Sequence, residues 1–87
     1  MIWTRSALRD LESIRTYIRQ FNPLAAQRMA SRLLNAAEAL RDQPGQGRTI
    51  SGGRRELVII RPYLIRYMVE GDTALILRVR HGARRLG

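Results

Sequence analysis

Arginine is the residue type in this chain with the clearest chemical potential. All sixteen basic residues are arginines, and seven acids leave a formal net charge of +9. Nine of the arginines fall within residues 44–87, and two of them, Arg78 and Arg80, lie within three residues before the single histidine, His81. A guanidinium binds phosphate and carboxylate groups in bidentate geometry, which indicates a nucleic acid, a nucleoprotein assembly or an acidic protein as partner. A basic surface that serves solubility is the alternative that composition leaves open.

The remaining composition excludes several classes of site. With no cysteine and one histidine, the chain lacks ligands for a disulfide framework or a zinc site, so we expect no metal and no cofactor. Eighty-seven residues suffice for a single domain, 1–87. The sequence contains neither a bilayer-spanning apolar stretch nor the layout of a secretion signal, and we therefore expect a soluble cytoplasmic protein.

The elements that position these arginines begin with a short strand at residues 2–4 and two helices. Ser6 is the expected N-cap of the first helix, which ends at Phe21 and carries an apolar stripe of Leu8, Leu11, Ile14 and Ile18. Asn22 and Pro23 start the second helix as N-cap and first helical residue. Its narrow apolar seam predicts close packing of the two helices as a hairpin; the seam consists of Ala26, Ala30, Leu33, Ala37 and Leu40.

The second half of the chain predicts an antiparallel sheet. After a loop at residues 43–47, the apolar period changes to two, and strands are expected at 55–60, 63–70 and 73–81. A three-residue loop, 70–72, segregates the side chains best. It predicts a core face of Ile65, Tyr67, Val69, Leu75, Leu77 and Val79, with Tyr63 also on that side, and an open face of Leu64, Arg66, Met68, Ile76, Arg78 and Arg80. Because apolar and cationic groups coincide on the open face, we interpret it as a binding face.

The order of these elements resembles the RelE/ParE superfamily of toxins. The resemblance rests on residues spread over nearly the whole chain: Trp3-Thr4, Ala7, Asp10 to Ile14, Tyr17-Ile18, Asn22-Pro23, Ala25-Ala26, Leu33, Leu40, Pro44-Gly45, Arg55 to Leu57, Pro62 to Tyr67, Ile76 to His81 and Arg84. It implies an α+β fold: a short N-terminal strand, a helical hairpin and a three-stranded antiparallel meander, forming a small antiparallel sheet with helices on one face. It also implies a type II toxin neutralised by a cognate antitoxin, whose acidic or amphipathic segment folds on binding. For that segment we expect contacts at Leu64, Met68, Ile76, Arg66 and Arg78.

The resemblance leaves two targets open. RelE-like members cleave mRNA on the ribosome, a reaction that needs a base, a cation and an acid. The lysine version of that site is impossible here, Leu64 stands where an arginine is often found, and residues 44–53 hold no acid. The remaining candidates for a nuclease are Arg66, Arg78, Arg80 and His81, with Glu56 as a remote base.

ParE-like members inhibit DNA gyrase by binding, and we favour this branch and a protein that is not an enzyme. The segments 62–67 and 77–85 resemble that branch, and the chain continues past the last strand with Arg84 and Arg85. The expected target-binding residues are Arg66, Arg78, Arg80, His81, Arg84 and Arg85. A degenerate toxin that acts as antitoxin partner or co-repressor is a third possibility.

Overall fold

The computed structural model describes residues 1–82, so the predictions for Arg84 and Arg85 concern residues outside the described range. The chain runs β1 (Ile2–Trp3), α1 (Arg5–Arg19), α2 (Pro23–Ala39), β2 (Arg48–Thr49), a short 3₁₀ turn (Ser51–Gly53), β3 (Arg55–Ile60), β4 (Tyr63–Glu70) and β5 (Thr73–His81). The three long strands have the expected bounds. The two short strands, β1 and β2, form the outer edges of the sheet.

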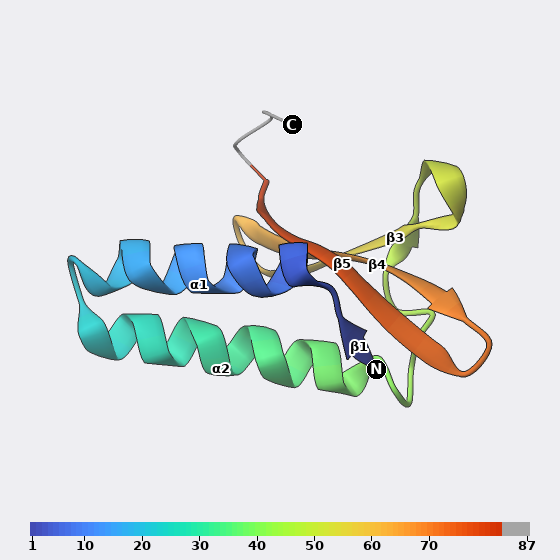
Figure 1. The fold of residues 1–87 in the computed structure, drawn as a ribbon, viewed down its shortest axis with the longest axis horizontal. Helices are drawn as coiled ribbons and strands as arrows, with labels where there is room; N and C mark the ends of the chain where they lie inside the picture. Colours follow the sequence, from blue (N-terminus) through green and yellow to red (C-terminus); the bar gives the residue numbers. More distant parts are fainter. Residues whose placement is uncertain (83–87) are drawn as a thin grey trace.

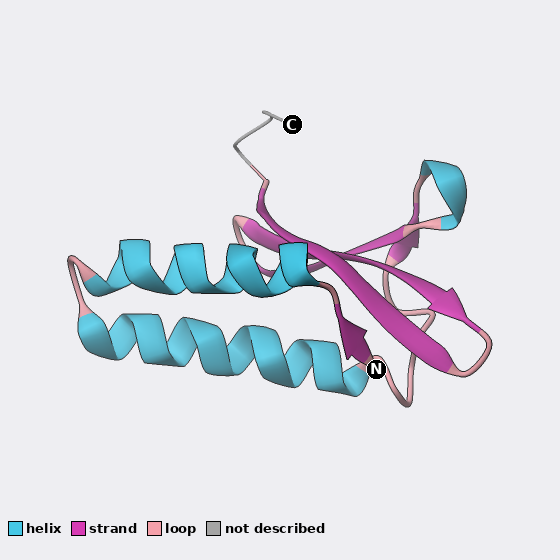
Figure 2. Ribbon diagram, viewed as in Figure 1, coloured by secondary structure: helices cyan, strands magenta, loops and turns pink. Residues whose placement is uncertain are grey.

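The five strands form one mixed sheet in the order β1-β5-β4-β3-β2 (Figure 1). The expected antiparallel meander holds for β3, β4 and β5. The β2 strand, which the sequence did not predict, pairs antiparallel with β3, and β1 pairs with β5 in parallel. The two helices lie side by side as the expected hairpin, and its connecting end extends away from the sheet (Figure 2). No helix within residues 1–82 has the length and apolar character needed to cross a membrane.

The first helix differs from its predicted start and stripe. Thr4, not Ser6, is the N-cap, and its Oγ1 accepts a hydrogen bond from the Ala7 amide at 3.1 Å. Thr4 holds this place because its own amide and hydroxyl also donate to β5, at the carbonyls of Ile76 and Leu77. The helix therefore starts two residues earlier, against the sheet. Ala7 is fully buried there, while the predicted stripe residue Leu8 is half exposed.

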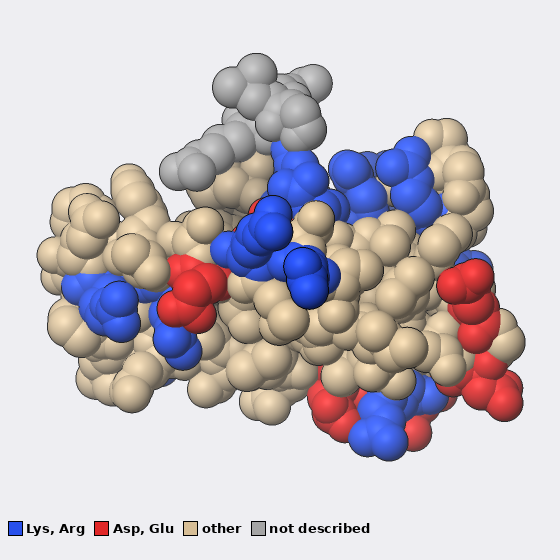
Figure 3. Space-filling view, in the orientation of Figure 1, with Lys and Arg blue, Asp and Glu red and all other residues tan. Residues whose placement is uncertain are grey.

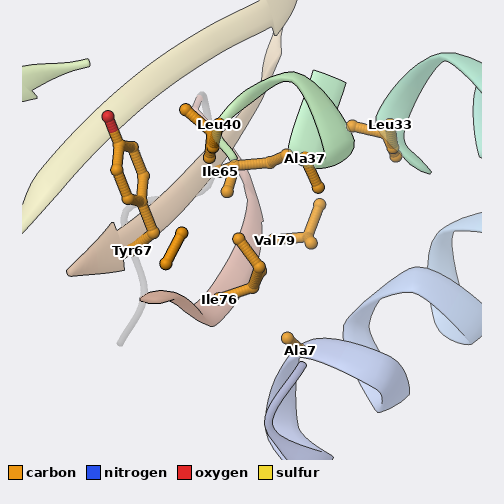
Figure 4. Close-up of a cluster of buried hydrophobic side chains, with 9 residues drawn as sticks. Ala7, Leu33, Ala37, Leu40, Ile65, Tyr67, Ile76 and Val79 are labelled. Atoms are coloured by element: carbon orange, nitrogen blue, oxygen red, sulfur yellow. The ribbon is translucent and has the colours of Figure 1, made fainter. Parts of the chain in front are cut away.

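The second helix and the core agree with the sequence. Asn22 caps the helix through its side chain, with Pro23 as first helical residue, and all five seam residues are buried. Three seam residues, Leu33, Ala37 and Leu40, share a core cluster with one face of β4 and β5 (Figure 4). This core face of the sheet carries Ile65, Tyr67, Ala74, Ile76 and Val79, none more than 3% exposed.

The predicted register of the β4–β5 hairpin is wrong. Glu70 pairs with Thr73, so the loop has two residues, and Gly71 adopts a φ of 59° that this tight turn requires. A register shift follows, because Tyr67 pairs with Ile76 while Arg66 pairs with Arg78. Leu77 is thus the extra residue of a β-bulge. The bulge exchanges the alternation within β5, so Ile76 is fully buried and Leu75 and Leu77 are only partly covered.

Candidate partner-binding face

The side of the sheet turned away from the core carries a mixture of charged and apolar side chains. Residues directly opposite each other in neighbouring strands share a face. The register therefore places one set together, which we call the open face: Glu56, Val58, Leu64, Arg66, Met68, Leu75, Arg78 and Arg80. Val58 is 56% exposed, and Leu64, Met68 and Leu75 are half-buried. The apolar and cationic character that the sequence predicted is thus present.

The predicted membership of this face needs one correction. Ile76, expected to contact the antitoxin there, is fully buried in the core. Leu75 takes its place opposite Met68 because the bulge at Leu77 shifts the alternation by one residue. Val58, which the sequence reasoning did not single out, also lies on this face opposite Leu64. Its alternation with Leu57 and Ile59 in an apolar strand gives no local signal of which side faces outward.

An ion-paired row of side chains crosses the middle of the open face. The Arg66 guanidinium donates to Glu56 Oε2 from Nε at 3.1 Å and from Nη2 at 2.7 Å. Arg48 Nη2, from the edge strand β2, donates to the other carboxylate oxygen of Glu56 at 3.1 Å. The Glu56 side chain is only 9% exposed. Glu56 is therefore adjacent to the strand arginines, whereas the sequence had suggested a remote position.

These contacts change the chemistry of the Glu56 carboxyl. Its pKa is lowered, chiefly by the hydrogen bond from Arg66, while burial partly opposes the shift and the charges of Arg66 and Arg48 add to it. A carboxylate with a lowered pKa is a weaker base, and its oxygens are already engaged.

Arg78 is tied to the first helix. Asp10 accepts from Arg78 Nε at 2.7 Å and Nη2 at 3.1 Å, and also from the Val79 backbone amide at 2.9 Å. The side-chain hydrogen bonding with Asp10 raises the pKa of Arg78 above its ordinary value. The β1 strand pairs only with Leu75 and Ile76 of β5. Beyond these two residues, side chains of the first helix and its cap bind the β5 backbone: Thr4 donates to the Leu77 carbonyl and Asp10 accepts from the Val79 amide. Asp10 thus links α1 to β5.

His81 points to the other side of the sheet from the arginines. It pairs with Tyr63, one step beyond the Leu64–Arg80 pair, and the two rings meet edge to face with centroids 5.1 Å apart. Tyr63 is partly buried against the core, as predicted. The structure thus brings Arg66, Arg78 and Arg80 together on the open face and leaves His81 at the strand end on the core side.

A buried tyrosine fixes the loop beside this face. The Tyr67 hydroxyl donates to the Pro44 carbonyl at 2.6 Å and accepts from the Gly47 amide at 2.9 Å. A Cβ at position 47 would lie 2.8 Å from the Glu56 carbonyl oxygen and 2.9 Å from the Tyr67 ring, so the close approach requires glycine. This contact leads the chain into β2 and places Arg48 next to Glu56.

The charge distribution agrees with this arrangement. Basic side chains gather along the upper side of the view in Figure 3, over the strands, and acidic side chains gather over the β4–β5 turn. Among residues 1–82, no group of three or more His, Cys, Asp or Glu side chains is arranged to hold a metal ion. The arrangement of the open face suits contact with acidic or phosphate groups flanked by apolar ones.

Comparisons with known proteins give a consistent family. Residues 1–86 match the family model of the ParE toxin of the type II toxin–antitoxin system parDE. Toxin RelE2 of Caulobacter vibrioides is 52% identical over 84 residues, covering 97% of this chain and 96% of the relative. The putative toxin Y4kP of Sinorhizobium fredii is 42% identical, covering 91% and 83%. A solved structure from the chromosomal ParDE system of P. aeruginosa superposes with a TM-score of 0.80 at 27% identity, covering 91% of this chain and 90% of that one.

Proposed function

Because this chain belongs to the ParE toxin family of type II toxin–antitoxin systems, and so has a cognate antitoxin, we propose that it inhibits DNA gyrase by binding. The observation that carries the proposal concerns Glu56, the acid among the arginines of the open face: both of its carboxylate oxygens accept hydrogen bonds from arginines. The proposal places the toxin in the cytoplasm, where bacterial DNA and gyrase lie.

Cleavage of mRNA requires a base that can take the proton of a ribose hydroxyl. Such a base must reach the proton at hydrogen-bond distance with an unoccupied oxygen, and its pKa should lie near the working pH. Glu56 meets neither requirement, because both of its oxygens accept from arginines and its pKa is lowered. Arg78 is likewise engaged by Asp10. These contacts favour binding over side-chain catalysis.

Binding to a protein–DNA complex suits the same surface. Arg66 and Arg80 present charge beside the apolar side chains of Leu64 and Met68, which is the composition of an interface that contacts acidic or phosphate groups. We propose that Arg66, Arg78 and Arg80 contact the target, with His81, Arg84 and Arg85 as further contacts toward the C-terminus.

We further propose that the antitoxin covers the open face and so competes with the target. The apolar contacts would come from Leu64, Met68, Leu75 and Val58, and the charged contacts from Arg66 and Arg78. An acidic amphipathic segment matches this surface in charge and in polarity. The apolar and the charged contacts together offset the entropic cost of ordering the segment when it folds on binding.

The test is a supercoiling and DNA-cleavage assay of purified gyrase with the toxin, with and without antitoxin. Lost supercoiling that antitoxin restores is the expected result. Gyrase that stays fully active at high toxin concentration would contradict the proposal. Cleavage of mRNA in a ribosome-programmed assay would then identify the RelE-like activity, and inactivity in both assays a toxin that only binds its antitoxin.

A matched pair of variants locates the target contact. Arg80→Gln removes one positive charge from the open face, and Arg28→Gln removes one from α2 in the helical layer. We expect Arg80→Gln to raise the inhibitory concentration about tenfold, the value of one charge-assisted hydrogen bond, and Arg28→Gln to leave it nearly unchanged. Equal effects of the two variants would reduce the role of the open face to net charge.

A further inference from the structure

Glu56 holds two arginines from the strands on either side of it. Its Oε1 accepts from Arg48 on β2, and its Oε2 accepts from two nitrogens of Arg66 on β4. The register places Glu56 directly opposite both arginines, so the carboxylate lies between them. Without it, two like charges would face each other across one strand with long, mobile side chains.

Both arginines keep surface for a partner while Glu56 holds them. The Arg66 side chain is 29% exposed, and its Nη1 has no hydrogen-bond partner among residues 1–82. The Arg48 side chain is 76% exposed. An arginine that is already immobilised loses less rotamer freedom when a partner carboxylate binds it. The carboxylate therefore lowers the entropic cost of recognition while it reduces the net positive charge of the face.

We propose that Glu56 is a positioning residue for antitoxin recognition, which fixes the guanidinium groups of Arg66 and Arg48 in the geometry that acidic side chains of the antitoxin bind. This inference rests on the proposed antitoxin contact at the open face. It does not depend on whether gyrase is the target.

Positioning and net charge make opposite predictions for one substitution. Glu56→Gln adds one positive charge to the toxin, so attraction to an acidic segment alone predicts tighter antitoxin binding. If Glu56 positions the arginines, Glu56→Gln weakens binding despite the added charge, because an amide has one acceptor oxygen and cannot hold both guanidinium groups. Glu56→Asp keeps the charge but shortens the reach by one methylene, and positioning predicts that it also weakens binding.

The experiment is calorimetric titration of the isolated toxin with its cognate antitoxin. We expect Glu56→Gln and Glu56→Asp each to weaken binding about tenfold, the value of one charge-assisted hydrogen bond. Glu12→Gln is the matched control: it makes the same change of charge at an exposed acid of α1, paired with Arg15, and we expect unchanged or slightly tighter binding. Thermal melting of each variant verifies that it is folded at the titration temperature.

Leu64→Ser distinguishes failure of the positioning role from failure of the site. If Leu64→Ser weakens binding while Glu56→Gln leaves it unchanged or tightens it, the positioning role is overturned and the open face stands. If Leu64→Ser leaves binding unchanged, the open face is not the antitoxin site, and the positioning role falls with it. Arg48→Gln changes a mostly exposed side chain that is no part of the core, and we expect it to weaken binding several-fold, more than Arg28→Gln does.

Discussion

The two faces of the sheet use the same three strands for different purposes. The centre of the core face is covered by the helices, and among residues 1–82 no buried residue carries a charged side chain. The open face holds arginines with acids between or beside them, next to apolar side chains that are only partly covered. Changes on the core face should therefore reduce the stability of the fold, whereas changes on the open face should reduce partner binding first.

Two ion pairs of the open-face arginines have different structural roles. The closest contacts of Arg66 with Glu56 and of Arg78 with Asp10 are both 2.7 Å long. Glu56 joins neighbouring strands that already pair through their backbones, whereas Asp10 joins α1 to β5 across 68 residues and also binds the Val79 amide. Two ion pairs of the same length thus have different roles, and the Asp10 pair contributes to holding the first helix on the sheet as well as to the open face.

The largest expected effect comes from charging the seam of the second helix. Leu33 is 0% exposed, so Leu33→Asp buries an unpaired carboxylate and removes apolar contacts. We expect a loss of at least about 4 kcal/mol in the free energy of unfolding, enough to unfold much of the isolated chain. Chemical denaturation measures it, with Leu33→Met as the volume-conserving control. A wild-type melting curve for Leu33→Asp would refute the placement of the seam.

The next effect tests whether Asp10 belongs to the fold. Asp10→Ala removes the partner of Arg78 and leaves the Val79 amide without its acceptor, and we expect a loss of about 2 kcal/mol in the free energy of unfolding. Glu12→Ala, at an exposed acid two residues away, should cost less than about 0.5 kcal/mol. Equal stabilities of the two variants would place the Asp10 contact among ordinary surface pairs.

Local signals in the sequence were enough to predict the elements but not their register. The bounds of the three long strands follow from alternating apolar residues and from turn residues between them, and Asn22-Pro23 marks the second helix directly. The bulge at Leu77 has no such signal, because either register of β5 places aliphatic residues inward. The observed register is the one that buries Ala74 and Ile76. That burial depends on the helices packed on the sheet, which the sequence of β5 alone does not specify.

The contacts of the open face were predictable to different degrees for a related reason. Placing Arg66 and Arg78 on one face needed alternation within the strands and the choice of a β4–β5 register that segregates apolar side chains. Pairing Arg66 with Glu56 needed the β3–β4 register, and pairing Arg78 with Asp10 needed the position of α1 against the edge of β5. Thr4 became the N-cap for the same reason, since its hydroxyl and amide serve the sheet as well as the helix.

A smaller effect concerns the buried hydroxyl of Tyr67 on the core face. Tyr67→Phe keeps the buried ring but removes the hydroxyl that binds Pro44 and Gly47. We expect a loss of about 1 kcal/mol and faster amide exchange at Gly47, because that amide loses its buried acceptor. Tyr63→Phe, at a ring that meets His81 edge to face, is the control for removal of a phenolic hydroxyl. A stability loss in Tyr67→Phe without a change at Gly47 would show that the hydroxyl does not hold the loop.

The smallest effect separates the open face from the core by its dependence on pH. Because folding lowers the pKa of Glu56 below its ordinary value of 4.5, its ion pairs stabilise the fold above that pH. This contribution fades as the pH falls through the lowered folded-state pKa. Glu56→Gln has no carboxyl to titrate, so the gap in unfolding free energy between wild type and variant should narrow from pH 7 to pH 3. The gap for Tyr67→Phe, which involves no acid, should stay constant over the same range. A Glu56→Gln gap that is equally wide at both pH values would mean that the carboxylate does not stabilise the folded sheet through these pairs.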